Sequence, residues 1–407
     1  MAYGGIVVFD GNSLTVGDGS TGGADYPAQV MIYLNPYGAY TKYNYGVGGQ
    51  KTTDMAADAA AQIDILYSAG NAQNILVAWE VTNDLFFGAS AATAYANIVS
   101  YCQARQAVGF QVVVLTVLPR SNVGTPGSFE ADRQTVNTSI RANWSTFADA
   151  LADVAADTRI GDSGDEINVA YYDGSLVHLG NEGYGVVADI TAAAIFGLMG
   201  LTMLVLQPTA AASSNAFILA TSATTNFGNN ADHHVGDQDG GGGSAHFRSL
   251  LDMSLTALPD NAVISLAMFS LYAWLDASIN ARTFSIYRIM VPWVEAEVTW
   301  NKRNSSTNWE TAGAFGATDC EQVALASRAM TATETLNVRK QFICSATTKA
   351  AMTLGYGWLH RAATEVSDLY GFKSPNAVVV SQTPKLIFVY ALPSVTMSRS
   401  AMPGRPW

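Results

Sequence analysis

The stretch Gly-Ile-Val-Val-Phe-Asp-Gly-Asn-Ser-Leu at residues 5–14 decides how the first half of the chain folds. Its four consecutive apolar residues, 6–9, are typical of a strand that is covered on both faces of a parallel sheet. Gly11 permits a tight turn, and Ser13 follows at the point where open α/β sheets present their ligand sites. Taken alone, a serine after a strand is more often a helix cap than a nucleophile. Ser13 therefore needs support from other segments.

Similar short apolar runs alternate with Ala-rich stretches of helical length as far as residue 200. This alternation predicts a five-stranded parallel sheet with helices on both faces. We expect the strands at 5–10, 42–47, 74–81, 111–118 and 168–172. We expect the helices near 24–34, 52–69, 89–108, 128–156 and 181–198.

The composition changes after about residue 207, where Gly, Ser, Thr and Asn become frequent. In this part of the chain we expect short strands separated by turns, for example at 262–273, 283–289 and 385–390. Regularly spaced strands of this kind indicate an antiparallel sandwich. A chain of 407 residues also exceeds one ordinary core. We therefore predict an α/β domain over 1–200, an all-β domain over 201–393 and a tail over 394–407.

The charge is unevenly distributed along the chain. Its net value of −12 lies in residues 1–206, which carry 19 acidic and 7 basic side chains, whereas the remainder is neutral. An acidic surface repels phosphate, so nucleic acid is excluded as a partner. The sparsely charged second half permits a homo-oligomer interface.

Two further features concern the environment of the protein. The start of the chain shows no secretory leader, which favours a virion-associated protein, or an extracellular one without its leader. The apolar stretch 190–206 is short for a membrane span and contains Gly197 and Gly200. We expect it to be the end of a buried helix and the next strand. Cys320 and Cys344 can pair on adjacent strands, but buried free thiols are the preferred interpretation.

Three later motifs each follow a predicted strand or precede a helix. They are Asn-Tyr-Gly-Val-Gly-Gly at 44–49, Val-Thr-Asn-Asp-Leu at 81–85 and Asp-Gly-Ser-Leu-Val-His-Leu at 173–179. Because the carboxyl ends of parallel strands meet at one edge of a sheet, we expect these motifs to converge on Ser13.

Together with the Ser13 segment, this ordered set resembles the SGNH (GDSL) hydrolase superfamily over about residues 4–199. The resemblance implies a flavodoxin-like three-layer α/β/α fold and an ester hydrolase that needs no metal or other cofactor. It implies Ser13 as the nucleophile and His178 as the base. It further implies an oxyanion hole made of the backbone N–H groups of Ser13 and Gly49 and the side-chain amide of Asn83.

The chain departs from the pattern of that family at three positions. Asn12 stands where the first motif has Asp, and Val81 replaces the glycine of the third block. The family's acid lies three residues before the histidine, where this chain has Ser175; an aspartate, Asp173, lies five residues before it. We expect Asp173 to support His178, because a carboxylate fixes the tautomer and stabilises the imidazolium. Support from Ser175 or from a backbone carbonyl is the alternative.

The second domain resembles the DNRLRE type of β-sandwich (jelly roll) over about residues 202–392. The most distinctive element is Trp-Val-Glu-Ala-Glu-Val-Thr-Trp-Asn at 293–301. We expect Trp293 and Trp300 in the core, and leave open whether Trp274, Trp309 and Trp358 stack on sugars. A structural Ca²⁺ is a further possibility in this domain. The acidic and histidine side chains near residue 235 are better interpreted as a solvated loop than as a metal site; they are Asp232, His233, His234, Asp237 and Asp239.

These features predict an esterase for short-chain or carbohydrate O-acyl esters, with the second domain binding a glycan or an assembly. A lipase or thioesterase of the same fold is an alternative. A second alternative is a non-catalytic virion adhesin with a degenerate hydrolase domain, which the departures at Val81 and Ser175 favour and the intact Ser13 and His178 oppose.

Overall fold

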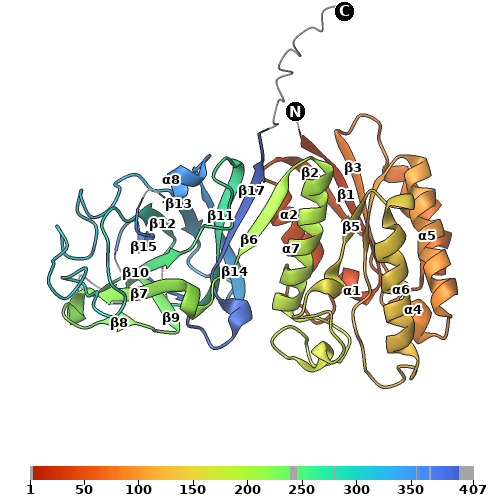
Figure 1. Cartoon of the computed structure of the whole chain (residues 1–407), viewed down its shortest axis with the longest axis horizontal. Helices are drawn as coiled ribbons and strands as arrows, with labels where there is room; N and C mark the ends of the chain where they lie inside the picture. Colours follow the sequence, from red (N-terminus) through yellow and green to blue (C-terminus); the bar gives the residue numbers. More distant parts are fainter. Residues whose placement is uncertain (1–2, 239–244, 278–279, 354, 366–367, 394–407) are drawn as a thin grey trace, which may run out of the picture.

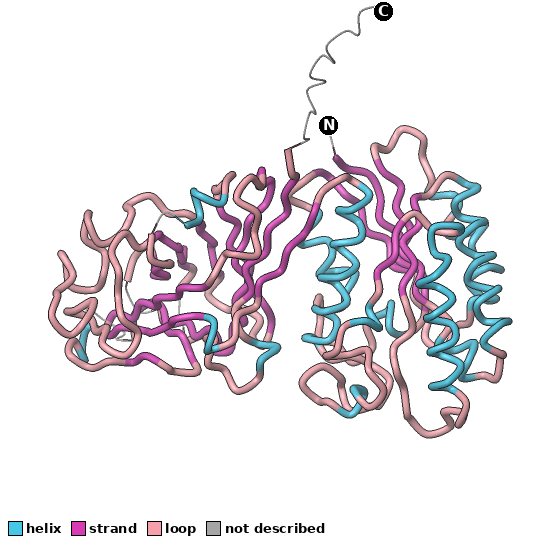
Figure 2. Tube along the Cα trace, in the orientation of Figure 1, coloured by secondary structure: helices cyan, strands magenta, loops and turns pink. Residues whose placement is uncertain are grey.

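The computed structural model describes residues 3–238, 245–277, 280–353, 355–365 and 368–393. The tail expected over 394–407 and the Gly-rich run at 240–244 lie outside these residues. Two bodies follow one another along the chain, an α/β domain and a β-rich domain (Figure 1). Helices are confined almost entirely to the first body, and strands dominate the second (Figure 2).

The first domain contains a parallel sheet of five strands in the order β2-β1-β3-β4-β5, which is the flavodoxin-like order. The strands are β1 (Tyr3–Gly11), β2 (Gly38–Asn44), β3 (Gln73–Trp79), β4 (Gln111–Leu115) and β5 (Ala150–Ala152). The helices are α1 (Ser13–Val16), α2 (Tyr26–Leu34), α3 (Thr52–Gln62), α4 (Thr82–Phe86), α5 (Ala91–Val108), α6 (Phe129–Asn143) and α7 (Asn181–Leu198). The predicted three-layer α/β fold is confirmed.

Successive residues of β1 point to opposite faces of this sheet, as the period of a strand requires. Val7 and Phe9 pack with α2 and α7, whereas Ile6 and Val8 pack with α3, α5 and α6. Both faces are therefore covered, which explains why the central strands are apolar throughout.

The predicted fifth strand was wrong. Residues 168–172 form a turn with one isolated bridge between Tyr172 and Leu179, and β5 lies earlier, at Ala150–Ala152. The true strand is only three residues long and alanine-rich, so it carries little of the β-branched signal that identifies strands. The expected helix over 128–156 accordingly ends at Asn143.

The second domain is β-rich, as predicted, and all its strand pairs are antiparallel. Its strands are β6 (Thr202–Leu206), β7 (Ser213–Leu219), β8 (Phe227–Gly228), β9 (Asp232–Asp237), β10 (His246–Met253), β11 (Val263–Asp276), β12 (Arg282–Arg288), β13 (Ala326–Met330), β14 (Val338–Cys344), β15 (Trp358–Ala362), β16 (Leu369–Lys373) and β17 (Lys385–Ala391). Among the described residues of this domain, the short α-helix α8 (Lys349–Thr353) lies between β14 and β15.

These strands belong to one sheet that closes on itself like a barrel, rather than to two separate sheets. The path runs β14-β13-β12-β15-β10-β9-β16-β11, and β11 pairs with β14 to complete the ring. Closure is possible because β11 has 14 residues and shifts register near Ile264 and near Ala273. A long strand with bulges can bend and pair with different neighbours along its length.

Aromatic and sulfur side chains fill the interior of this domain. Trp309 and Trp358 are buried, and Trp293 and Trp300 are partly buried against the same cluster as Trp309. Cys320 and Cys344 are buried free thiols, as expected. These tryptophans are therefore explained by packing.

The apolar interface between the two domains is continuous with the core of the first. Leu266 and Met268 of β11 and Ile387 and Val389 of β17 belong to the same buried cluster as the residues of α2 and α7. Strands β6 and β17 lie beside α7 in Figure 1. The stretch 190–206 is therefore a helix end followed by a strand, and within the described residues no helix is long and apolar enough to cross a membrane.

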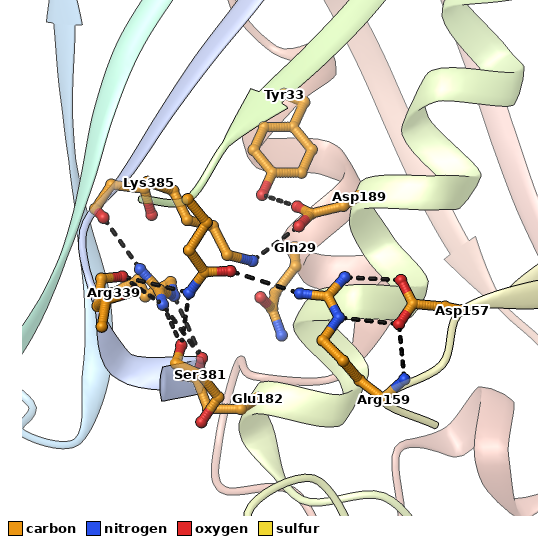
Figure 3. Close-up of polar contacts among 12 residues, drawn as sticks. Gln29, Tyr33, Asp157, Arg159, Glu182, Asp189, Arg339, Ser381 and Lys385 are labelled. Atoms are coloured by element: carbon orange, nitrogen blue, oxygen red, sulfur yellow. Dashed lines mark hydrogen bonds and ion pairs between the residues drawn. The ribbon is translucent and has the colours of Figure 1, made fainter. Parts of the chain in front are cut away.

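Buried charges cross the same interface. Asp189 of α7 lies between Tyr33 of α2 and Lys385 of β17 (Figure 3). Its two carboxylate oxygens contact the Tyr33 hydroxyl at 2.7 Å and the Lys385 Nζ at 2.7 Å. A second pair joins Glu182, in the first turn of α7, to Arg339 of β14 at 3.2 Å. The second domain is thus fixed to the helix that follows His178.

Candidate active site at the carboxyl edge of the parallel sheet

Ser13 begins α1 directly after β1. The Asn12 side chain caps this short helix by accepting a hydrogen bond of 2.8 Å from the backbone N–H of Leu14. Gly11 is required in this turn, because a Cβ there would lie 2.3 Å from the backbone oxygen of Trp79. The close approach of β1 and β3 at Gly11 therefore places the Ser13 hydroxyl at the edge of the sheet.

His178 lies against this hydroxyl. Its Nε2 is 2.9 Å from the Oγ of Ser13, although 165 positions separate the two residues. The histidine is presented by a tight reversal of the chain in which the backbone N–H of Asp173 donates to the carbonyl of His178 at 3.0 Å. Leu176 adopts a left-handed conformation, with φ of 64°, at the tip of this reversal. The structure therefore brings together the two residues on which the sequence interpretation rests.

The other ring nitrogen contacts Ser175 and not Asp173. Ser175 Oγ lies 3.3 Å from Nδ1 of His178 and also accepts the backbone N–H of His178 at 2.9 Å. The Asp173 carboxylate instead accepts the backbone N–H of Ser175 at 2.8 Å. The expected contact of Asp173 with the ring is corrected here: the carboxylate closes the local Asp-Gly turn, which is the ordinary use of such a pair.

The three residues expected to supply the oxyanion donors, Ser13, Gly49 and Asn83, line one cleft. Among the residues that the structure describes, the backbone N–H groups of Ser13 and Gly49 have no protein acceptor. One N–H of the Asn83 amide donates to the carbonyl of Gln50 at 2.9 Å, which leaves the other for a substrate oxygen. Gly49 has a φ of 79°, a conformation that favours glycine.

A buried glutamate, Glu80, joins the nucleophile turn to the oxyanion turn. Its carboxylate accepts hydrogen bonds from the Asn12 side chain and, at 2.9 Å, from the backbone N–H of Asn83. Complete burial raises the pKa of Glu80 well above its usual range. The sequence motifs did not reveal this link; the position of Glu80 directly after β3 is the sequence signal for it.

Two further acids near the site, Asp10 and Asp84, form hydrogen bonds that join neighbouring segments of the first domain. Burial raises the pKa of Asp10 to about 6, and its partners are the Tyr101 hydroxyl and the Gln50 side chain. Asp84 accepts the backbone N–H of Thr52 at 3.0 Å and its hydroxyl at 2.7 Å, at the first turn of α3. These contacts give both carboxylates structural roles beside the site.

A cleft of about 330 Å³ opens above Ser13 and His178. Gly49, Asn83 and Arg120 line it, together with apolar side chains that include Phe86. The Arg120 side chain lies over the Phe86 ring at 4.0 Å. The sequence motifs did not single out Arg120; its place after β4, at the carboxyl edge of the parallel sheet, is the sequence signal that points to it.

The acidic and histidine side chains near residue 235 do not gather into a site. Asp232 pairs with Lys373 at 2.7 Å, and Asp237 pairs with His246 at 2.7 Å. The segment is a strand, β9, and not the expected loop; Asp239 lies outside the described residues. Within the described part of the chain, no group of three or more His, Cys, Asp or Glu side chains could hold a metal.

Comparisons with known families agree with the division of the chain into an α/β domain and a β-rich domain. Residues 9–186 match the GDSL-like Lipase/Acylhydrolase family, and residues 207–322 match carbohydrate-binding module family 96. This match does not by itself show the DNRLRE type, which stays a prediction. No curated protein sequence matches the chain.

Several solved structures are similar to the first domain. TesA is 16% identical, with 47% of this chain and 99% of that chain covered and a TM-score of 0.39. A member of the lipolytic G-D-S-L family from Veillonella parvula is 18% identical, with 46% and 94% covered and a TM-score of 0.37. An acetyl xylan esterase, AlAXEase, is 19% identical, with 47% and 99% covered and a TM-score of 0.36.

The family match covers the segment that places Ser13, Gly49, Asn83 and His178 around one cleft. The second match begins just after β6 and ends within the β-rich domain. The first domain of this chain is therefore similar to the GDSL-like lipase/acylhydrolase family over residues 9–186, and the second is similar to carbohydrate-binding module family 96 over residues 207–322.

Proposed function

We propose that the protein hydrolyses short-chain or carbohydrate O-acyl esters through an acyl-enzyme on Ser13. The observation that carries this proposal is the distance of 2.9 Å between Ser13 Oγ and His178 Nε2 inside a cleft that Gly49 and Asn83 also line. A base in hydrogen-bond contact with a hydroxyl is the arrangement that nucleophilic catalysis by serine requires.

The reaction follows from the positions of these groups. Ser13 Oγ attacks the ester carbonyl while Nε2 of His178 takes the hydroxyl proton. The carbonyl oxygen becomes negatively charged and accepts hydrogen bonds from the Ser13 and Gly49 backbone and from Asn83. The C–O bond then breaks, and the alcohol leaves with the proton from His178. Water repeats the sequence on the acyl-enzyme and releases the acid.

A carbohydrate ester is the preferred substrate class. The second domain matches a carbohydrate-binding module family, and its attachment to α2 and α7 keeps it beside the hydrolase domain. In this proposal the second domain holds a glycan while the first removes its acyl groups. An extracellular or virion-associated location, where acylated glycans are accessible, belongs to the same proposal.

The decisive variant is Ser13→Ala. We expect it to lower the hydrolysis of 4-nitrophenyl acetate to the uncatalysed level, because the nucleophile is absent, with an unchanged melting temperature. Retained hydrolysis by this variant would remove the assignment of Ser13.

A series of nitrophenyl esters from acetyl to octanoyl, run beside acetylated xylan, tests the substrate class. Preference for the acetyl ester and release of acetate from the glycan support the proposal. Preference for octanoyl would favour the lipase or thioesterase alternative. Absence of hydrolysis on every ester, and of reaction with a fluorophosphonate, would favour the non-catalytic adhesin.

A further inference from the structure

The Arg120 side chain occupies an unusual position in the cleft. It follows β4 and is half-buried, and its Nη1 lies 3.3 Å from the Oδ1 of Asn83. Its Nε donates to the Oδ1 of Asn122 at 3.0 Å, and its guanidinium lies over the Phe86 ring. These contacts hold the guanidinium in a defined place beside the expected oxyanion donor.

Within the described residues no carboxylate forms an ion pair with this guanidinium. Burial lowers the pKa of Arg120 to about 10, and the nearby Glu80 opposes that effect. A cation that is partly removed from water and lacks an acidic partner costs free energy in the resting protein. Such a cost is offset where negative charge develops during a reaction.

The contacts of Asn83 fix which way its amide points. Its Nδ2 donates to the Gln50 carbonyl at 2.9 Å, and its Oδ1 accepts from Arg120. If the amide oxygen and nitrogen of Asn83 exchanged places, two acceptors would meet at the Gln50 carbonyl and two donors would meet at the Arg120 guanidinium. Both contacts would be repulsive, so the observed orientation is favoured. A charged donor on Oδ1 also polarises the amide, and polarised groups donate more strongly.

The Arg120 loop also contacts the histidine turn. The backbone N–H of Ser121 donates to the carbonyl of Leu176 at 3.0 Å, two residues before His178. One loop therefore touches both the oxyanion donor and the segment that carries the base.

We propose that Arg120 is a positioning residue of the reaction, which orients and polarises Asn83 so that its free N–H binds the oxyanion. This inference rests on the ester hydrolysis proposed above. It assigns to Arg120 an effect that arises in the transition state, so kcat should depend on it far more than KM.

The test replaces Arg120 by Met, which removes the charge and keeps the length of the side chain, and by Lys, which keeps the charge. For 4-nitrophenyl acetate we expect kcat to fall about 10- to 30-fold in Arg120→Met, less than the loss of a direct donor. KM should change less than about twofold. Arg120→Lys should recover part of the loss. The control is Arg141→Met. Arg141 of α6 pairs with Asp153, and neither residue lines the cleft, so the kcat of this variant should match the wild type.

A double-variant cycle separates this role from a structural one. If Arg120 acts through Asn83, then Arg120→Met should have almost no further effect in an Asn83→Ala background. Equal losses in both backgrounds at an unchanged melting temperature would overturn the proposal. If Arg120→Met lowers the melting temperature, Arg120→Lys in the same cycle gives the answer.

The alternative is that Arg120 binds an anionic part of the substrate. The acetate ester of 4-hydroxybenzenesulfonate carries such a charge, and a loss confined to its KM would overturn the positioning role. An inactive wild type would contradict the proposed function, whereas an active wild type with an equally active Arg120→Met contradicts only this inference. The rate at which a fluorophosphonate modifies Ser13 can also be compared between the wild type and Arg120→Met, and this measurement needs no catalytic turnover.

Discussion

The ring of His178 has a serine on each side: Ser13 at Nε2 and Ser175 at Nδ1. In the proposed reaction Nε2 accepts the Ser13 proton, so Nδ1 carries the hydrogen and donates to Ser175 Oγ. Ser175 also accepts the His178 backbone N–H, so a single hydroxyl fixes both the ring and its main chain. The carboxylate of Asp173 acts one step further away, on the Ser175 N–H.

This arrangement predicts an order of effects. Ser175→Ala should lower kcat about three- to tenfold, the value of one lost hydrogen bond, and Asp173→Ala should lower it less. Ser175→Asp places a carboxylate three residues before the histidine, so the kcat of this variant should equal or exceed the wild-type value. Steady-state kinetics on 4-nitrophenyl acetate measure all three. A larger loss in Asp173→Ala than in Ser175→Ala would show that the aspartate reaches the ring in solution.

At the scale of elements, the turn between β3 and α4 carries backbone strain. Val81 is fully buried and has a φ of 96° with a ψ of −33°, a conformation that glycine adopts readily and a β-branched residue does not. The strain sets the direction of Thr82 and Asn83 at the start of α4. The burial of the Val81 side chain offsets part of the free energy that this backbone strain costs.

We therefore expect an inverted order of stability at this position. Val81→Ala loses burial but keeps the positive φ, whereas Val81→Gly loses burial and releases the strain. The glycine variant should be more stable than the alanine variant by about 1 kcal/mol, although glycine is normally the worse of the two. Urea denaturation of both variants measures the difference. The usual order, with alanine more stable, would mean that Val81 is unstrained.

At the scale of the whole molecule, the two domains share a buried ion pair. Burial lowers the pKa of Lys385, while Asp189 opposes that effect. Removing one partner leaves a buried charge without compensation, so Lys385→Met should lower the free energy of unfolding by about 3–5 kcal/mol. The shared apolar cluster predicts that both domains unfold in one calorimetric transition.

The control for this prediction is Lys42→Met on β2. Lys42 lies 3.8 Å from Asp25 at the surface, and loss of an exposed pair should change stability by less than about 1 kcal/mol. Combining Lys385→Met with Asp189→Leu should recover much of the loss, because an apolar pair replaces the charges. Equal effects of Lys385→Met and Lys42→Met would show that the interface opens in solution.

The sequence alone determined the class of the first domain and the convergence of its site. Apolar runs mark strands covered on both faces, and polar motifs after parallel strands meet at one edge, so the segments of Ser13 and His178 were expected to converge. The pairing of the two side chains followed from the resemblance to the SGNH hydrolases. The three-residue strand β5 escaped detection because its alanines lack a strand signal.

Only the tertiary structure decided the partners of these residues. The choice between Ser175 and Asp173 depends on the shape of one turn, and the role of Arg120 depends on an amide in a distant loop. The closure of the second sheet and the pairing of Lys385 with Asp189 likewise join residues that are far apart in sequence. The periodicity of a sequence indicates which face of an element a residue is on. Hydrogen bonds and ion pairs require two atoms to be placed to within a few tenths of an ångström, and only the folded structure sets those positions.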